Sequence, residues 1–389
     1  MRPRILFVDD DPNILDSFRA SLRRHFNLDT AEGPLRGLEM VRSCGPYEVV
    51  VSDLRMPDMD GVRFLSEVAT ILPDAARIML TGHADLEASM NAVNEGRIFR
   101  FLTKPAATAA LIKSLDAGVA QYRLVTAVKE KQRQLERDLE AAAYVQRRFL
   151  PQTPPDVPGL SVAWRFMPCA ELGGDMFHVF VLSPGSLGLY MLDVSGHGAP
   201  SALVAVSLSQ LLMPQSGYLV RQGAIIPPGE VLAALDRDFP MERFEKHFTI
   251  FYGVLDLASG RLRYSGAGHN PPLVLRADGG LERLSRGGPM IGLGFPAAFD
   301  EGTVTLNTAD KLLVYTDGLI QYQAADGGMF SQGRLEACAL DRRELPPERL
   351  VEALVAAMLE FGGHALPMDD VSLLCLEMAR PGGTETRRS

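Results

Sequence analysis

Carboxylates in the first third of the chain follow short apolar runs that have the pattern of buried strands. Asp9 and Asp10 follow the first run, Asp53 the third, Thr81 the fourth and Lys104 the fifth. The carboxyl ends of parallel strands meet at one edge of a sheet, where ligands bind, so we expect these side chains to share one crevice. Mg²⁺ prefers oxygen ligands and keeps several waters. The sequence therefore predicts a Mg²⁺ site in this crevice, with Lys104 offsetting the remaining charge and Asp53 placed to accept a phosphoryl group.

A second set of carboxylates lies in the last two thirds of the chain, and each borders an apolar, strand-like run. The set consists of Asp175, Asp193, Asp317 and the pair Asp369 and Asp370. We expect paired strands to bring these acids together at one sheet end. No histidine or cysteine cluster accompanies them, which favours Mg²⁺ or Mn²⁺ over zinc. Two such ions activate a bridging water near neutral pH, so the pattern indicates hydrolysis of a phosphate ester.

Glycines and histidines adjoin these acids. Gly173, Gly174 and Gly196 allow the backbone to approach the ions closely. His197 and His269 are candidates for general acids, but a histidine in a tight glycine turn more often orients the loop through hydrogen bonds. Both interpretations stay open from the sequence.

The composition limits the classes of partner. The length of 389 residues predicts two or three domains. The net charge of -9 argues against binding to nucleic acid or to an anionic membrane, because a negative surface would not be attracted to either. No apolar stretch reaches the roughly 18 residues of a spanning helix. The four cysteines are scattered and no apolar leader follows Met1, which indicates a cytoplasmic protein.

Three patterns follow one another along the chain. Continuous apolar runs alternate with helical patterns over the first 115 residues, as in a doubly wound α/β domain with a five-stranded parallel sheet. A charged helical stretch over about 115–150 ends at Pro151. After Pro158, short strands and glycine turns surround helices expected near 198–212, 228–239 and 346–361, which is an α+β pattern.

The charged helix carries a partial heptad repeat. Val128, Leu135, Ala142 and Phe149 are spaced by seven, and the other seam positions are Val125, Gln132, Leu139 and Gln146. The helix is either a single amphipathic helix packed on a domain or one strand of a parallel coiled coil that joins two chains. The second interpretation predicts a homodimer through residues 115–150.

The first 125 residues resemble the receiver domain of bacterial two-component response regulators. The matching motifs are Val8-Asp9-Asp10, Asp53-Leu54-Arg55-Met56-Pro57-Asp58-Met59-Asp60-Gly61, Thr81-Gly82 and Lys104-Pro105. The resemblance implies that Asp53 is the phosphoacceptor and that a sensor histidine kinase is the partner. It also implies a Mg²⁺ site made by Asp9, Asp10, Asp53 and the Arg55 carbonyl. Thr81 and Lys104 would contact the phosphoryl oxygens, and Phe101 occupies the aromatic switch position of the family.

Residues 145–378 resemble the bacterial metal-dependent serine/threonine phosphatases of the SpoIIE/RsbU type, a branch of the PP2C-like (PPM) superfamily. The matching motifs are Val145–Pro151, Gly173–Asp175, Asp193–Gly198, Ser265–Pro272 and Gly288–Leu293. The resemblance implies an α-β-β-α sandwich that holds two Mg²⁺ or Mn²⁺ ions.

The same resemblance implies a role for each acid. Asp193 would bridge the two ions, Asp175 and the Val194 carbonyl would serve one side directly or through water, and Asp317 and Asp369 would hold the other. Asp370 is expected to position these ligands without binding an ion directly. His178 and Gln321 stand where the family often has acids, and both departures would lower activity.

The sequence thus predicts a receiver domain over 1–120, a helical coiled-coil linker over 121–150, a phosphatase domain over 151–380 and a flexible tail over 381–389. The predicted function is a response regulator in which phosphorylation of Asp53 controls dephosphorylation of a phosphoserine or phosphothreonine protein. By resemblance, that protein is a STAS-type anti-sigma-factor antagonist. The alternative is a non-hydrolytic adaptor that binds a sigma-factor regulator. A transcription factor lacks support, because no basic recognition stretch follows the receiver.

Overall fold

The computed structural model describes residues 2–82, 98–294 and 298–378 and divides into two units, Met1–Arg137 and Asp138–Ser389. The predicted tail 381–389 lies outside the described residues. No helix among the described residues combines the length and the apolar character needed to cross a membrane. The positions of the predicted domain boundaries stay predictions.

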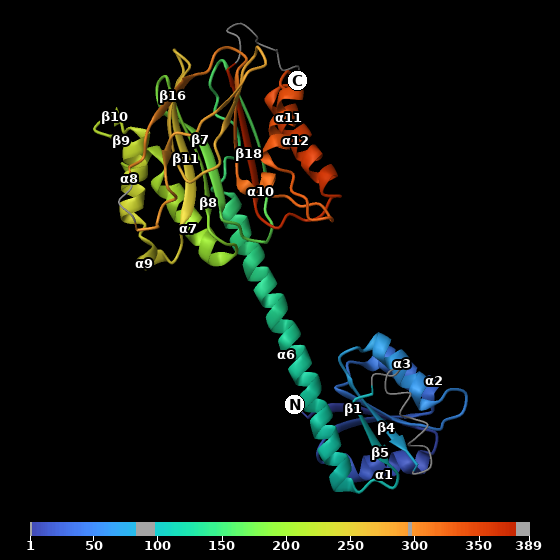
Figure 1. The fold of residues 1–389 in the computed structure, drawn as a ribbon. Coiled ribbons are helices and arrows are strands. Elements are labelled where there is room, and N and C mark those ends of the chain that lie inside the picture. The colour runs from blue at the N-terminus through green and yellow to red at the C-terminus, as the bar shows by residue number, and fades with distance from the viewer. Residues whose placement is uncertain (1, 83–97, 295–297, 379–389) are drawn as a thin grey trace. The chain divides into compact units, whose positions relative to one another are not determined.

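The first unit contains the predicted five-stranded parallel sheet (Figure 1). Its strands are β1 (Arg4–Asp9), β2 (Asn27–Glu32), β3 (Val49–Asp53), β4 (Ala76–Thr81) and β5 (Arg100–Thr103), in the order β2-β1-β3-β4-β5. The helices α2 (Pro34–Cys44) and α3 (Gly61–Ile71) pack on one face, and α1 (Pro12–Leu22) packs on the other. The central strands are therefore buried on both faces, which explains their continuous apolar runs.

One helix, α6 (Thr108–Arg147), contributes to the cores of both units. Leu111 and Leu115 are buried in the core of the first unit, and Ala143 is buried in the second. The predicted helix is confirmed, but it begins at Thr108, earlier than expected, and it ends at Arg147, so the three residues before Pro151 are not helical. The last helix of the receiver and the linker are therefore one continuous element.

Two sheets form the second unit, and their pairs are antiparallel except that β15 runs parallel to β12. The first has the order β15-β12-β11-β8-β7, with β16 paired to β12, and the second has the order β14-β13-β17-β18-β6. The strands of the first are β7 (Asp175–Ser183), β8 (Ser186–Val194), β11 (Phe248–Asp256), β12 (Arg261–Ala267), β15 (Gly287–Gly288) and β16 (Gly302–Thr305). Those of the second are β6 (Leu160–Met167), β13 (Leu273–Leu275), β14 (Leu281–Arg283), β17 (Lys311–Tyr315) and β18 (Val371–Met378). A small hairpin of β9 (Val220–Arg221) and β10 (Ala224–Ile225) stands apart.

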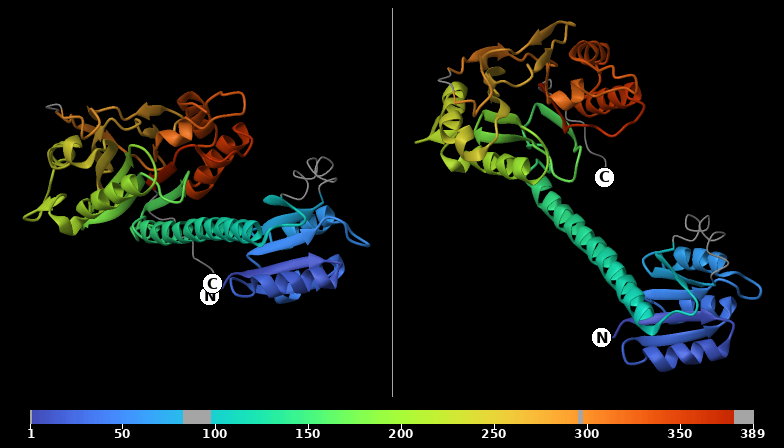
Figure 2. Two further views of the ribbon diagram at one scale, coloured as in Figure 1. Left: turned by 90° about the horizontal axis from the view of Figure 1, so that it is seen from below. Right: turned by 60° about the horizontal axis from the view of Figure 1, so that its bottom comes forward.

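Helices cover the outer faces of the two sheets (Figure 2). The helices α7 (Ala199–Leu211) and α8 (Pro228–Asp238) pack on the first sheet, and α12 (Pro347–Phe361) packs on the second with α11 (Gln332–Asp341) beside it. The shorter helices are η2 (Pro214–Ser216), α9 (Met241–Phe244) and α10 (Asp317–Ile320). Side chains from both sheets, such as Tyr252 and Leu374, share one buried core. This arrangement is the predicted α-β-β-α sandwich, and the three predicted helices in this unit are confirmed as α7, α8 and α12.

Candidate metal centres

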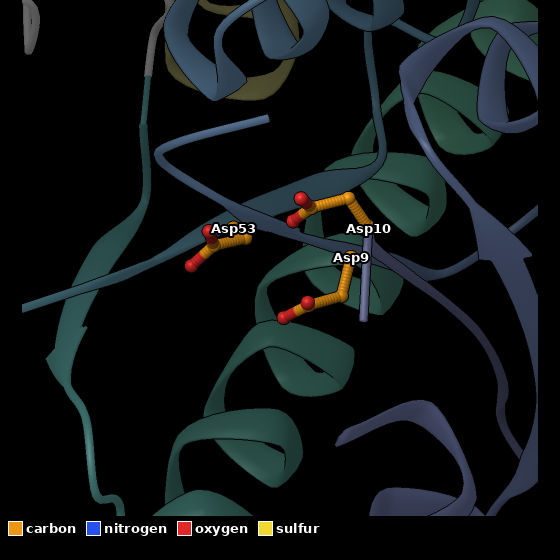
Figure 3. A group of neighbouring side chains, drawn as sticks. All are labelled: Asp9, Asp10 and Asp53. Atoms are coloured by element: carbon orange, nitrogen blue, oxygen red, sulfur yellow. The ribbon is translucent and has the colours of Figure 1, made fainter. Parts of the chain in front are cut away.

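Three aspartates of the first unit converge where β1 and β3 end. Ligand atoms of Asp9, Asp10 and Asp53 all lie within 4.8 Å of one another, and Figure 3 shows the three side chains next to each other. Lys104 lies between two of them, with its Nζ 2.7 Å from Asp9 Oδ2 and 2.6 Å from Asp53 Oδ1. Three carboxylates against one ammonium leave two negative charges. The donor set and its charge therefore fit a divalent, oxygen-loving cation such as Mg²⁺.

The electrostatics of this crevice keep Lys104 charged. Burial lowers the pKa of Lys104, but hydrogen bonds to Asp53 and Asp9 outweigh this effect, so its pKa lies above the ordinary value. Asp53 Oδ2 also accepts a hydrogen bond of 3.2 Å from the backbone N–H of Arg55. This bond brings the Arg55 backbone to the crevice, and the role of the Arg55 carbonyl stays a prediction.

The two predicted switch residues lie on neighbouring strands. Thr81 is buried at the end of β4, and its hydroxyl donates to the Gly82 carbonyl at 3.3 Å. Phe101 on β5 is half-buried against the core that α2 and α3 cover. Thr81 thus lies at the same sheet edge as Asp53. The ring of Phe101 packs, half-buried, on the sheet face that α2 and α3 cover.

The acids of the second unit come from both sheets. Asp175 begins β7 and lies opposite Asp193, which is the last residue but one of β8, in the first sheet. Asp317 begins α10 directly after β17, and Asp369 and Asp370 directly precede β18, in the second sheet. The expectation that one sheet end gathers all five acids is wrong, because the two sheets of the sandwich face each other and each supplies part of the group.

Two of these acids tie the sheets together. Asp175 Oδ2 accepts hydrogen bonds from the hydroxyls of Thr316, at 2.8 Å, and Ser372, at 2.6 Å, which both belong to the second sheet's segments. Asp370 accepts from the backbone N–H of Cys169 at 2.9 Å and from that of Asp175 at 3.3 Å. Both oxygens of Asp370 are thus engaged with backbone, which supports a positioning role for it. Among the described residues, Asp175 Oδ1 is the oxygen that these bonds leave for a cation or its water.

Burial, together with mutual repulsion, raises the pKa values of several of these acids. Burial, followed by the charges of Asp317 and Asp369, raises the pKa of Asp193 to about 7. Burial and the charge of Asp193 raise the pKa of Asp175 well above its ordinary range, and burial also raises that of Asp317. In the described part of the chain, none of the five acids forms an ion pair with Lys or Arg. The oxygen donors and their unbalanced charge fit Mg²⁺ or Mn²⁺.

The five acids are less tightly grouped than the receiver aspartates. Within the described ranges, only the receiver aspartates form a group of three or more whose ligand atoms all lie within 4.8 Å. Asp193 interacts electrostatically with Asp175 of its own sheet and with Asp317, Asp369 and Asp370 of the other sheet. The five acids thus form an extended group, and the number of ions that they hold stays a prediction.

Glycines make the close approach around Asp175 possible. A Cβ on Gly173 would lie 2.0 Å from Asp370 Oδ2, and a Cβ on Gly174 would lie 2.4 Å from the Val194 carbonyl oxygen. Neither distance is sterically tolerable, so a larger residue would displace the Asp370 carboxylate at Gly173 and would require a backbone shift at Gly174. The Val194 carbonyl, a predicted ligand, therefore lies against the backbone that carries Asp175.

The two histidines differ in environment. His269 Nδ1 lies 2.9 Å from Thr249 Oγ1, and burial lowers the pKa of His269 to about 3. A neutral imidazole at physiological pH does not act as a general acid, so the structural interpretation holds for His269. Burial raises the pKa of Asp369, and the exposed His197 lies close enough to Asp369 to oppose this effect in part. A role of His197 as a general acid therefore stays a prediction.

The two departures from the family pattern also have partners. His178 packs against Phe180, with 5.7 Å between ring centroids, and its Nδ1 lies 3.1 Å from the Val179 carbonyl. Gln321 donates a hydrogen bond from Nε2 to Asp317 Oδ2 at 2.9 Å. His178 thus belongs to the packing of β7, whereas Gln321 directly contacts a predicted metal ligand.

The sequence analysis missed two positioning residues. Gln146 Nε2 donates to the Gly173 carbonyl at 2.8 Å, and the Gly173 N–H donates to Gln146 Oε1 at 3.3 Å. Lys246 Nζ donates to the Ser195 carbonyl at 2.8 Å, two residues after Asp193. The polar interruption of the heptad seam at Gln146 was a signal that this side chain has a partner elsewhere. Lys246 gave no signal, because its proximity depends on the pairing of β11 with β8.

Known protein families match separate parts of the chain. Residues 183–379 match the family described as Stage II sporulation protein E (SpoIIE), and residues 5–116 match the response regulator receiver domain. Phosphoserine phosphatase RsbP of Bacillus subtilis (strain 168) is 31% identical over 196 residues, which cover 49% of this chain and 46% of RsbP. Transcriptional regulatory protein GlrR of Escherichia coli (strain K12) is 34% identical over 118 residues, 30% of this chain and 26% of GlrR. The chain therefore spans less than half the length of either relative.

A solved structure supports the fold of the second unit. The SiaA-PP2C domain of Pseudomonas aeruginosa covers 64% of this chain and 98% of its own, with a TM-score of 0.54. Its sequence identity is 20%, so the likeness concerns the fold alone.

Proposed function

Because the chain belongs to the SpoIIE family and carries a receiver domain, we propose that it is a response regulator whose output is metal-dependent hydrolysis of phosphoserine or phosphothreonine in a protein. The observation that carries this proposal is the group of five carboxylates from two sheets. Burial raises the pKa values of Asp175, Asp193, Asp317 and Asp369, and repulsion between the acids adds to this effect at Asp175, Asp193 and Asp369. No Lys or Arg of the described residues forms an ion pair with any of the five acids.

The acids have distinct roles in the proposed reaction. Two bound Mg²⁺ or Mn²⁺ ions would supply an activated water and neutralise charge on the phosphoryl oxygens. Asp193, which interacts with acids of both sheets, would hold both ions, with Asp175 and the Val194 carbonyl on one side. Asp317 and Asp369 would hold the other side. Asp370 keeps Asp175 in place through the backbone bonds described above.

The receiver would control this reaction through Asp53. One carboxylate oxygen of Asp53 attacks the phosphorus atom of a phosphohistidine in a sensor kinase, and the bond from phosphorus to the histidine nitrogen breaks. Lys104 already lies 2.6 Å from Asp53 Oδ1 and would pair with a phosphoryl oxygen. A Mg²⁺ ion between Asp9, Asp10 and Asp53 would offset the added charge. Thr81 and Phe101 would then move as the family's switch residues do.

The proposed partners follow from the same two domains. A sensor histidine kinase would phosphorylate Asp53, and a STAS-type anti-sigma-factor antagonist, phosphorylated on serine or threonine, would be the substrate. The relative RsbP is named as a phosphoserine phosphatase, which supports the chemistry of this assignment.

We also propose that α6 pairs with its copy in a second chain. Leu124, Val128 and Leu135 are exposed apolar side chains on this helix. By contrast, Gln146 and Phe149 contact their own phosphatase unit, so they are not free seam positions. The seam available to a partner helix therefore ends before Gln146.

A non-hydrolytic adaptor is the second candidate, and one contact favours it. Gln321 occupies Asp317 Oδ2 with an amide hydrogen bond where the resemblance leads us to expect an acid. An adaptor would keep the fold and bind its partner without turnover.

One assay separates the two candidates. The full chain is incubated with p-nitrophenyl phosphate and with a phosphoserine peptide, each with Mn²⁺ and with a chelator. We expect Mn²⁺-dependent turnover that Asp193→Asn abolishes, whereas Asp156→Asn, an exposed acid outside the group, leaves it unchanged. Absence of turnover in the wild type at saturating Mn²⁺ would favour the adaptor.

A further inference from the structure

Two exposed apolar side chains lie beside the proposed catalytic acids. Leu366 is 88% exposed and Met368 is 81% exposed, the highest values for large apolar side chains in the described part of the chain. Both belong to the loop between α12 and β18, and Met368 directly precedes Asp369. A single exposed Leu is ordinary, but two adjacent to a reaction centre point to a contact surface.

The loop that carries these side chains is fixed to the rest of the unit. The Tyr322 hydroxyl donates to the Ala365 carbonyl, and Pro367 is buried. Leu366 thus lies between a hydrogen-bonded residue and a buried one. Its exposure results from how the loop is held, because both flanking residues are anchored.

The hydrogen bond of Tyr322 also links this loop to the segment that follows Asp317. Tyr322 follows α10, the helix that Asp317 begins, and Figure 1 shows the loops after α10 and α12 close to each other. The Phe330 ring, from the segment after Tyr322, packs on the Phe361 ring at the end of α12, with 5.8 Å between centroids. These two contacts therefore connect the segment that follows Asp317 to the loop that carries Leu366, Met368 and Asp369.

Chain connectivity places the exposed pair within reach of any bound protein substrate. Leu366 is three residues from Asp369, so their Cα atoms are at most about 11 Å apart. Each partner in a stable protein contact covers about 800 Å², a disc of roughly 16 Å radius. A phosphorylated protein segment that reaches Asp369 extends beyond its phosphoryl group over the neighbouring loop.

We propose that Leu366 and Met368 form a docking surface for an apolar side chain that flanks the phosphoserine or phosphothreonine of the protein substrate. This inference rests on the proposed phosphatase function. The phosphoryl group would go to the acids and their ions, and the flanking apolar side chain would be removed from water against Leu366 and Met368. The acids thus select the phosphoryl group, and the exposed pair selects the neighbouring sequence.

Two peptides and one small substrate test this inference on the full chain with Mn²⁺. Both peptides contain phosphoserine, one with leucine and one with glutamine at the positions on each side, and p-nitrophenyl phosphate has no flanking residues. The variants are the double substitution Leu366→Ser with Met368→Ser and the control Val181→Ser. Val181 is also exposed, but it is six residues along β7 from Asp175, a distance of about 20 Å.

We expect the wild type and Val181→Ser to prefer the leucine peptide by about tenfold or more in kcat/KM. The double variant should lose this preference and hydrolyse p-nitrophenyl phosphate at the wild-type rate. Equal rates for the two peptides in the wild type, or a preference that survives the double substitution, would overturn the docking surface.

Two further outcomes are also decisive. If the double variant loses turnover of p-nitrophenyl phosphate, the loop positions Asp369 and does not dock substrate. If light scattering shows that the double substitution changes the oligomeric state while the peptide preference persists, the occupant is a second copy of the chain. No turnover of any substrate by the wild type would overturn the proposed phosphatase function itself.

Discussion

Gln146, near the end of α6, holds Gly173 through both the nitrogen and the oxygen of its side-chain amide. Its Nε2 donates to the Gly173 carbonyl at 2.8 Å and its Oε1 accepts from the Gly173 N–H at 3.3 Å. Gly173 lies two residues before Asp175, and Gln146 is only 6% exposed. The helix that leaves the receiver is therefore bonded directly to the loop that carries a proposed metal ligand.

Gln146→Leu should weaken metal binding and destabilise the phosphatase unit. Leucine keeps the size of the side chain but leaves the buried N–H and C=O of Gly173 without partners, at a cost of about 1 to 3 kcal/mol. Calorimetry of the full chain should show a lower unfolding temperature, and a Mn²⁺ titration of activity should show a higher half-saturating concentration. Gln134→Leu is the matched control, because Gln134 is exposed on the same helix and is not a seam position. Equal effects of the two substitutions would contradict the role of the Gln146 contact.

Asp317→Asn should lower turnover at limiting Mn²⁺ and recover part of it in excess Mn²⁺. The substitution weakens one of the two proposed ion sites while Asp193 keeps the other, so we expect the apparent Mn²⁺ affinity to fall by at least about tenfold. Turnover of p-nitrophenyl phosphate against Mn²⁺ concentration measures this shift. Asp326→Asn, an exposed acid after α10, serves as the control. A Mn²⁺ dependence identical to that of the wild type would remove Asp317 from the ligand set.

The stability of the metal-free protein should fall as the pH rises through neutrality. The pKa of Asp193 is raised from 3.8 to about 7, chiefly by burial. The folded state therefore binds a proton that the unfolded state has lost, and this contribution is complete below about pH 3.8 and disappears as the pH passes about 7. Calorimetry with a chelator should show a lower unfolding temperature of the phosphatase unit at about pH 8 than at about pH 6.

Asp193→Asn and Mn²⁺ separate this effect from other titrations. The substitution removes the repelling charge, so it should flatten the pH dependence of the metal-free protein. Mn²⁺ should raise the unfolding temperature more at about pH 8 than at about pH 6, because protons compete for the same carboxylate at the lower pH. A Mn²⁺ effect that is larger at the lower pH would conflict with the assignment of Asp193.

Leu135→Asp should convert a dimer to monomers. It should also make the phosphatase activity independent of Asp53 phosphorylation. Leu135 is exposed on α6, and a charge there would be buried in the proposed helix pair without a partner. Light scattering gives the mass, and turnover with and without acetyl phosphate gives the coupling. Leu139→Asp is less suitable than the sequence indicates, because Leu139 packs against Ala143 and Leu172 of its own unit. A monomeric wild type in both phosphorylation states would rule out the pairing.

The sequence predicted the receiver more completely than the phosphatase site. In a parallel sheet, strand order and polarity put Asp9, Asp53 and Lys104 at one edge, so the position of each residue after its strand was enough. In the sandwich, the acids of β8 and those next to β18 belong to different sheets. Their proximity depends on how the sheets face each other, which no local pattern encodes.

The contact of Gln146 and the helix α11 were also not predicted, because both depend on the packed structure. Gln146 has the spacing of a seam position, and only the packed structure shows that its amide faces Gly173. The helix α11 was missed because it is short and has few buried apolar residues, Leu335 and Ala339 among them. Both depend on tertiary contacts that override the local signal.

The most direct measurement follows dephosphorylation of a phosphoserine peptide by the full chain with Mn²⁺, before and after acetyl phosphate is added with Mg²⁺. We expect turnover that requires Mn²⁺, and a rate that changes on addition of acetyl phosphate in the wild type and in Asp58→Asn but stays constant in Asp53→Asn. Asp58 is exposed and lies in the loop after Asp53, so it controls for the substitution alone. A rate that acetyl phosphate leaves unchanged in the wild type, or changes equally in Asp53→Asn, would contradict control of the phosphatase through Asp53.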